Sequence, residues 1–363
     1  MSVDKVIFAL IAVFAVLGGA DYILGNRFGL GKAFEEGLMT IGKLAITMVG
    51  ILVLAPCLAD ILEPLVVPVY RALGADPAVF AGSLLACDMG GAPMARELAD
   101  TPEAASLGGI LTASMLGVTI SFTLPVSMDM LKPEDRVYAS KGILCGILTI
   151  PIGVFAGGMT AGFPIQMVLQ NLVPIIGISV LIAIGLWKIE GLLLKAFAVL
   201  GKVMTGIAAV GVVAAGVKQL TGVTVIPGMA SLDEAFIVIG QIGIVLMGAL
   251  PLLTVLTGVL KKPLAFIGKK LQINNTSVAG IMASLANSIA AFGMVKDMDN
   301  RGKVINMAFA VSGAFVFGDH LAFTAGYEPS MVSALIVGKL VGGITAIAAA
   351  LWMTRKDREI THV

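Results

Sequence analysis

The chain has 363 residues, of which 58% are hydrophobic and only 13% are charged, and its mean hydropathy is +1.00. A soluble protein of this length needs far more charge to cover its surface, and a net charge of +1 gives no basis for binding nucleic acid. Apolar stretches of about 20 residues recur from end to end, as helices that cross a bilayer require. The composition therefore predicts an all-α polytopic membrane protein surrounded by lipid.

Eleven apolar segments follow one another in chain order, at about 6–24, 39–60, 77–99, 104–130, 137–161, 164–187, 192–220, 234–260, 275–297, 302–325 and 329–353. Two stretches between them are too short and too amphipathic to cross a bilayer. We expect these two, residues 61–74 and 261–273, to form helices that lie in the membrane interface.

The first five and the last five segments resemble each other when the chain is shifted by about 200 residues. Gly50 then meets Gly248, and the pair Leu85-Ala86 meets Leu285-Ala286. Matches that stay in chain order indicate an internal repeat. We infer a first repeat at 1–161, a linking span at 162–190, a second repeat at 191–354 and a cytoplasmic tail at 355–363.

Two topologies are compatible with these segments. Eleven full spans would divide the Lys and Arg residues of the loops almost evenly between the two faces. If 77–99 and 275–297 instead enter the membrane and turn back, only Lys5, Arg71 and Arg96 remain on one face. Because cytoplasmic loops carry the excess of positive charge, the second topology is favoured. It predicts two inverted repeats, about nine transmembrane helices plus two re-entrant hairpins, an outer N-terminus and a cytoplasmic C-terminus.

The first hairpin contains "DMGG", where Asp88 precedes Gly90 and Gly91. Each arm has about 11 residues, or about 16 Å of helix, which reaches the middle of the hydrocarbon layer. We therefore expect the chain to reverse at these glycines. In the second hairpin, "LANSIAAFG" holds Asn287 and Ser288 near the tip and Gly293 as the corresponding turn residue.

Asp88 is the leading candidate for a binding residue, since carboxylates deep in a membrane usually serve a function; the alternative is that it only bonds the N–H groups of its own turn. Asp319 and His320 follow Gly318 late in the segment 302–325, and they lie either in the same cavity as Asp88 or at an outer interface. Gly318, and Pro125 in the segment that a shift of 196 residues pairs with this one, both predict interrupted helices.

An acidic centre favours a small cation or an amine as the transported solute, and Thr119 or Thr123 are candidates for bonding a hydroxyl. Aromatic residues are too sparse for a cage around a methylated ammonium, whereas a carboxylate with backbone carbonyls suits a primary ammonium. No Lys or Arg is expected at the centre, because Lys339 is expected to reach an interface. The cysteines, Cys87 among them, are interpreted as small core residues.

Catalytic and cofactor motifs are missing. The two histidines are too few for a histidine-rich metal site, the three cysteines have no pairing or metal spacing, and neither a Walker-type loop, an HExxH motif nor a nucleophile elbow is found. We expect no enzyme, no metal and no cofactor. A coupling proton or sodium ion, and assembly into a homodimer, are left open.

The stretches "FAGSLLACDMGGAPMARELA", "SLANSIAAFGMV" and "MDNRGKVINMAFAVSGAFVFGDHLAF" resemble the EutH family, the ethanolamine transporters of bacterial ethanolamine-utilisation operons. The similarity runs over nearly the whole chain. It implies an inner-membrane permease that admits ethanolamine for breakdown by a cobalamin-dependent lyase. Where the resemblance leads us to expect two adjacent asparagines and then a proline, this chain has Asn287, Ser288 and Ala290.

These observations predict a carrier that binds protonated ethanolamine near the midplane and works by alternating access, with the two hairpins as gates. Two alternatives remain at this stage. One is a channel-like facilitator of ethanolamine, and the other is an ion-coupled carrier of another small amine.

Overall fold

The computed structural model describes residues 3–355, and every regular element in this range is helical. Apart from Arg355, the expected tail lies outside the described residues. The α-helices are α1 (Val3–Ile23), α2 (Leu30–Leu44), α3 (Gly50–Ala72), α4 (Ala78–Leu84), α5 (Gly91–Leu98), α6 (Pro102–Ser106), α7 (Leu124–Met130), α8 (Pro133–Thr160), α9 (Ile165–Lys188), α10 (Glu190–Thr221), α11 (Leu232–Leu271), α12 (Asn275–Ala286), α13 (Ser288–Met294), α14 (Asn300–Gly313), α15 (Asp319–Tyr327) and α16 (Val332–Met353). Three π-helical segments lie at Ala45–Val49, Leu107–Gly117 and Thr119–Thr123, and three short 3-10 turns lie at Cys87–Met89, Val295–Asp297 and Pro329–Met331.

Eight helical stretches of the described chain are long and apolar enough to cross a membrane. They are Val3–Ile23, Leu30–Ala72, Pro102–Met130, Pro133–Thr160, Ile165–Lys188, Glu190–Thr221, Leu232–Leu271 and Pro329–Met353. The expected span at 302–325 is present as two shorter helices, α14 and α15. The all-α membrane class is therefore confirmed, with eight continuous candidates for spans and one interrupted stretch.

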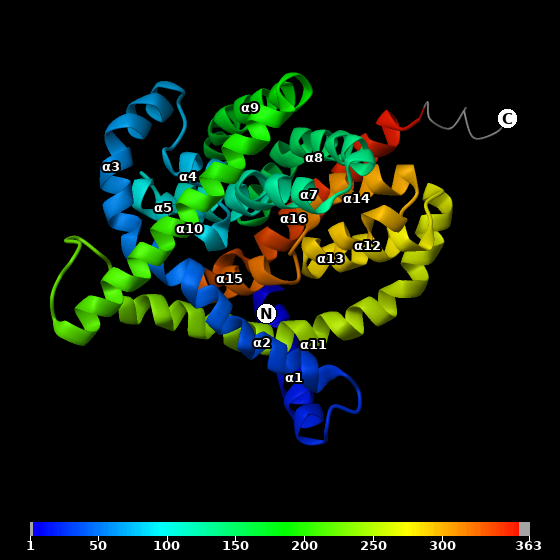
Figure 1. Cartoon of the computed structure of the whole chain (residues 1–363), viewed down its shortest axis with the longest axis horizontal. Helices are drawn as coiled ribbons and strands as arrows, with labels where there is room; N and C mark the ends of the chain where they lie inside the picture. Colours follow the sequence, from blue (N-terminus) through cyan, green and yellow to red (C-terminus); the bar gives the residue numbers. More distant parts are fainter. Residues whose placement is uncertain (1–2, 356–363) are drawn as a thin grey trace.

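The helices form an inner group and an outer frame. The inner group comprises α4 to α8 and α12 to α16, in which α8 packs against both α14 and α16. Gly153 of α8 lies so close to α16 that a Cβ there would be 2.7 Å from the carbonyl oxygen of Gly338, the close approach that small residues permit between membrane helices. Figure 1 shows α2, α3, α10 and α11 framing this group.

Two helices of the frame are longer than the sequence predicts. Residues 61–72 continue α3 and residues 261–271 continue α11, so the two expected interfacial helices are extensions of the preceding helices. Pro64 and Pro68 lie inside α3 and Pro263 lies inside α11. Prolines bend membrane helices more often than they end them, and Figure 1 shows α11 changing direction before it reaches α12.

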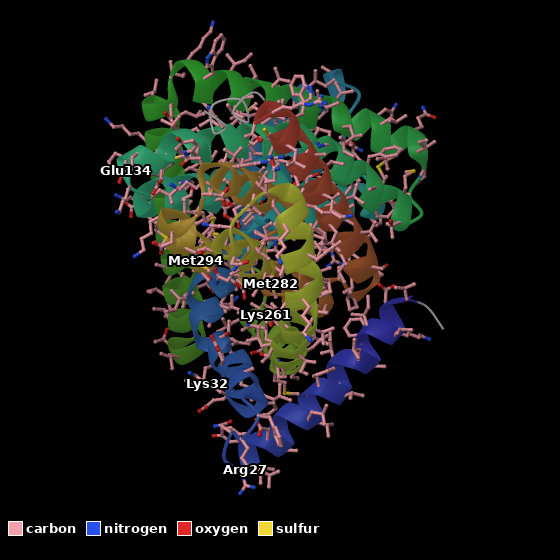
Figure 2. The ribbon with its side chains drawn as sticks, turned by 90° about the vertical axis from the view of Figure 1, so that its right-hand side faces the viewer. Arg27, Lys32, Glu134, Lys261, Met282 and Met294 are labelled. Carbon is pink, nitrogen blue, oxygen red and sulfur yellow. The ribbon has the colours of Figure 1, made fainter. Side chains whose placement is uncertain are left out.

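Helices α1 and α2 form a hairpin that extends away from the inner group. Figure 2 shows Arg27 at its tip. The buried Asp21 closes the turn, because its carboxylate accepts hydrogen bonds from the backbone N–H of Phe28 (3.0 Å) and of Gly31 (2.9 Å). Asp21 therefore has a structural role at the end of α1.

Candidate functional site

The first functional element is the pair α4 and α5, which are joined by an irregular turn at 85–90. Gly90 has a φ of +104°, in the left-handed region that glycine adopts readily, and the N–H of Gly91 donates to the carbonyl of Ala86 (2.9 Å). At the other end of the pair, the N–H of Asp100 donates to the carboxylate of Asp76 (3.0 Å). The two ends of the segment therefore lie together, and the chain reverses between them where "DMGG" stands.

The second element is the pair α12 and α13, which has the same architecture. The chain is extended at Asn287 (φ −154°, ψ 124°), and the N–H of Asn274, before α12, donates to Asp299, after α13, at 2.8 Å. Asn287 uses its side-chain oxygen to cap α13 through the N–H of Ile289 (2.8 Å). The expected turn residue Gly293 lies inside α13 instead, because an N-cap asparagine already starts the second arm.

A third interruption lies at 314–318, between α14 and α15, as the glycine at 318 predicts. The N–H groups of Phe315 and Phe317 donate to the carbonyls of Ser284 and Leu285, each at 2.9 Å. A side chain at Gly318 would overlap the carbonyl oxygen of Ala286. The end of α12 and the unwound segment thus satisfy each other's backbone groups, which buried irregular chain in a membrane requires.

The stretch that the sequence pattern pairs with this interruption behaves differently. The helical stretch Pro102–Met130 is continuous through Pro125, so the expected break there is absent. Its middle is instead wound as a π-helix over Leu107–Gly117 and Thr119–Thr123. A π-helix has wider turns than an α-helix and is frequent at functional sites. The N–H of Ala86 in the first turn donates to Ser121 on this stretch (3.2 Å).

Asp88, Cys87 and His320 come together at the centre. One oxygen of the Asp88 carboxylate lies 3.9 Å from Nε2 of His320, and the donor atoms of all three residues lie within 4.8 Å of one another. The Asp88 side chain is 18% exposed, whereas His320 is buried and its ring lies tilted against that of Phe315, with 5.0 Å between the ring centroids. Asp319, the first residue of α15, directly precedes His320 in the chain and so lies beside this cluster.

Lys339 differs most from the sequence interpretation, which placed it within reach of an interface. Its side chain is fully buried, and its ammonium donates at 2.5 Å to the carbonyl oxygen of Ser114, next to Ala113, which packs against Gly91 of the first turn. The centre is therefore not purely acidic. The trio of Cys87, Asp88 and His320 has the donor spacing of a metal site, but an ammonium beside it disfavours a doubly charged cation.

The predicted hydroxyl and amide ligands occupy two environments. Ser288 and Thr123 are buried, and their hydroxyls have no hydrogen-bond partner among the described residues. Thr119 donates to the carbonyl of Met115 (2.6 Å) within its own helix. Helix α13, which Ser288 begins, packs against α7, which follows Thr123. No hydrogen bond joins Asn287 or Ser288 to Asp88 in the part of the chain that the structure describes.

Sequence reasoning missed Cys87 and Lys339. Cys87 had no spacing from other cysteines or histidines that indicates a site. Its place beside Asp88 and His320 depends on which helix packs against it. Lys339 did carry a signal, since it lies seven residues after the first residue of α16, or about 10 Å along the helix axis. A charge at that depth is a functional candidate by default.

Two cavities lie at opposite ends of the stretch Pro102–Met130. One, of about 320 Å³, lies beside α6 and is lined by Arg96 and Tyr327 among others. The other, of about 820 Å³, lies between α7 and α10 and is lined by Lys195, Lys202 and Met89. Because Met89 follows Asp88 in the same turn, the larger cavity reaches the edge of the central cluster.

Comparison with known proteins gives a consistent assignment. The family described as "Ethanolamine utilisation protein, EutH" matches residues 3–353. The chain is 52% identical to the "Probable ethanolamine permease EutH" of Listeria monocytogenes, over 98% of this chain and 95% of the relative. It is 46% identical to the "Uncharacterized protein YxeR" of Bacillus subtilis (98% and 96%) and 43% identical to the "Probable ethanolamine permease EutH" of Salmonella typhimurium (98% and 97%).

No solved structure matches the chain. The family match covers nearly all of the sequence, and the relatives align with it from end to end. Together with the eight long apolar helices, these matches show that the chain is a multi-pass membrane protein and belongs to the EutH family of ethanolamine utilisation proteins.

Proposed function

We propose that this chain is a permease of the bacterial inner membrane, rather than an enzyme, and that it takes up protonated ethanolamine as a source of carbon and nitrogen. The names of three relatives, probable ethanolamine permeases, support the substrate. The observation that carries the mechanism is Asp88, a partly exposed carboxylate at a helix interruption of an otherwise apolar protein. Such a carboxylate is costly in a membrane and is retained where it binds a cation.

The chemistry of the centre suits a primary ammonium with a nearby hydroxyl. The ammonium of ethanolamine has three N–H donors, and the Asp88 carboxylate, with Asp319 as a second acid, provides charged acceptors. The unpartnered hydroxyls of Ser288 and Thr123 are available to bond the substrate hydroxyl, and Thr119 and Asn287 are further candidates. His320 would shape the pocket from α15.

We also propose that the pairs α4/α5 and α12/α13 are re-entrant hairpins in two inverted repeats. The hydrogen bonds Asp100–Asp76 and Asn274–Asp299, which bring the two ends of each pair together, support this. A segment whose ends meet on one face does not cross the membrane. With eight continuous spans and the interrupted pair α14–α15, the chain would cross nine times.

The positive charges support an outer N-terminus and a cytoplasmic C-terminus. Arg71 is paired with Asp100 at the base of the first hairpin (2.6 Å), and Arg96 lies over the ring of Tyr327 at the same end. Near the start of α1, Asp4 accepts a hydrogen bond from the N–H of Ser333, a few residues beyond Tyr327. The sparse positive charges of the expected outer face, including the neighbouring Lys5, therefore belong to one end of the molecule.

Alternating access is the transport mode that we propose. The two cavities lie at opposite ends of one helical stretch, and the first hairpin lines both, through Ala92 in the smaller and Met89 in the larger. A carrier needs such access from each side in turn, with the binding site between. Movement of the hairpins against α10 and α11 would close one cavity while the other opens.

The test replaces Asp88 with Asn in the full-length protein and measures uptake of radiolabelled ethanolamine into proteoliposomes. A charge-assisted hydrogen bond contributes about 1.5–3 kcal/mol, so the transport efficiency should fall about 10- to 100-fold. Asp60→Asn is the matched control, because Asp60 is an exposed acid on α3, and it should transport as the wild type does. Unchanged uptake by Asp88→Asn would remove the proposed role of this carboxylate.

A second measurement separates a carrier from a channel-like facilitator. Vesicles are preloaded with unlabelled ethanolamine, and entry of the labelled solute is followed. A carrier is accelerated by solute on the far side and saturates with concentration, whereas a channel does neither. Gradients of pH and of sodium imposed on the same vesicles reveal whether an ion is coupled to transport.

A further inference from the structure

Among the residues that the structure describes, Lys339 is the most buried charged side chain, and the proposed transport mechanism does not use it. Its side chain is completely shielded from solvent. In the part of the chain that the structure describes, the carbonyl oxygen of Ser114 is its hydrogen-bond acceptor, at 2.5 Å. An ammonium has three N–H donors, so two remain for other partners. A buried ammonium is unfavourable unless an opposite charge compensates it.

The opposite charge that Lys339 meets belongs to the first hairpin. Ser114, whose carbonyl accepts from Lys339, follows Ala113, and a Cβ at Gly91 of the hairpin would lie 2.9 Å from the Cβ of Ala113. The packing explains how this arises: α16 packs against the π-helical stretch Leu107–Gly117, and this stretch packs in turn against the hairpin turn Cys87–Met89. Lys339 therefore approaches the turn that carries Asp88 from α16, while His320 of α15 lies 3.9 Å from the Asp88 carboxylate.

The other buried lysine shows what a purely structural pair looks like. Lys303 of α14 donates to Asp135 of α8 at 2.6 Å, and its ammonium lies 5.5 Å from the ring of Tyr138. This pair has direct contact and joins two helices of the inner group. For Lys339, by contrast, the hydrogen bond that holds the ammonium goes to a neutral carbonyl, that of Ser114.

We propose that Lys339 determines specificity at the Asp88 site by occupying the place that a second cation would otherwise take. This inference rests on the proposed function. The positive charge of Lys339 balances one negative charge of the central carboxylates. A single monovalent ammonium is then enough to balance the remaining negative charge of the site. Protonated diamines are then rejected, because their second ammonium would meet that of Lys339, and no co-transported sodium ion is needed.

The experiment uses the full-length protein in proteoliposomes and compares two solutes of similar size. One is ethanolamine, and the other is ethylenediamine at a pH where both of its nitrogens are protonated. For the wild type, the diamine should compete poorly and replacing sodium by N-methylglucamine should not matter. For Lys339→Met, competition by the diamine relative to ethanolamine should improve at least about tenfold, and ethanolamine uptake should become sodium-dependent. Lys339→Arg, which keeps the charge, should retain the selectivity of the wild type.

The control is the double variant Asp135→Asn/Lys303→Met, which neutralises the other buried pair and should leave the diamine-to-ethanolamine ratio unchanged. The proposal is overturned if Lys339→Met keeps the ratio of the wild type. Thermal-shift measurements with both solutes report binding separately from transport. If the wild type binds and discriminates the two solutes but moves neither, the transport proposal fails and the specificity proposal stands.

The single variant Lys339→Met leaves the Asp88 carboxylate without its compensating charge and is expected to melt at a lower temperature. The double variant Asp88→Asn/Lys339→Met removes both charges and leaves no buried charge without its partner. Its melting temperature should therefore recover most of the decrease seen for Lys339→Met. A double variant that melts as low as Lys339→Met would show that the lysine only fills space, and would contradict the proposal.

Discussion

The pairs α4/α5 and α12/α13 have the same backbone plan and different chemistry at their interruptions. Both are two short helices whose ends are tied by a carboxylate, Asp76 in the first pair and Asp299 in the second. The first interruption carries the charged Asp88, and the second carries the neutral Asn287 and Ser288. The comparison teaches that two pairs of helices with the same backbone plan can carry a charge at one interruption and uncharged polar groups at the other.

The two turns are also built differently. In the first, left-handed Gly90 reverses the chain and backbone N–H groups bond the chain's own carbonyls. In the second, an asparagine caps the next helix, and the carbonyls at the end of α12 are satisfied by the unwound segment 314–318. The second turn therefore depends on a partner segment, whereas the first is more self-contained.

The largest expected effect on the free energy of unfolding comes from the contact between the second turn and the segment 314–318. Gly318→Ala places a methyl group against the carbonyl oxygen of Ala286, and we expect a loss of about 2–4 kcal/mol in the free energy of unfolding. Gly293→Ala is the matched control, since a Cβ there meets open space inside α13; it should be neutral or stabilise by up to about 1 kcal/mol. Thermal unfolding in detergent measures both, and equal melting temperatures would refute this view of the second turn.

The hydrogen bonds that tie the ends of the pairs α4/α5 and α12/α13 give the next largest effect on stability. Asp299 accepts hydrogen bonds from Asn274, Ser277 and Gly302, whereas Asp76 accepts them from two backbone N–H groups. At about 1 kcal/mol for each bond, Asp299→Ala should destabilise by about 2–3 kcal/mol and Asp76→Ala by about 1–2 kcal/mol. Differential scanning fluorimetry of the two variants, with Asp60→Asn as reference, tests this order; the reverse order would show that the bases are not held as described.

The smallest expected effect is that of a substitution at the second interruption, and it tests whether the residue there binds substrate or stabilises the fold. Ser288→Ala removes a buried hydroxyl that has no partner among the described residues, so the melting temperature should stay the same or rise slightly. If this hydroxyl bonds the substrate, the affinity for ethanolamine should fall about two- to tenfold, while that for ethylamine, which lacks the hydroxyl, should not change. Equal losses for the two solutes would assign Ser288 a structural role.

Much of the architecture could be predicted from the amino-acid pattern, because hydropathy and glycine placement are local properties. Long apolar runs predicted a membrane protein, "DMGG" predicted the site of chain reversal, and Gly318 predicted an interrupted helix. Other local signals misled for physical reasons. Pro125 does not break its helix, because it lies in the first turn of α7, directly after a π-helical stretch. Pro64 and Pro263 lie inside the continuous helices α3 and α11, where the sequence pattern indicated separate interfacial helices.

What the sequence determined by itself is the class of protein, the family, and the presence of a carboxylate at an interruption of an apolar segment. Only the tertiary structure decided which groups surround that carboxylate, because His320 and Lys339 come from helices more than 200 residues away in the chain. The burial of Lys339 depends on how α16 packs against α8 and the π-helical stretch, and no local sequence pattern predicts this packing. The same packing turned Lys339 from an expected interface residue into a charge at the centre of the site.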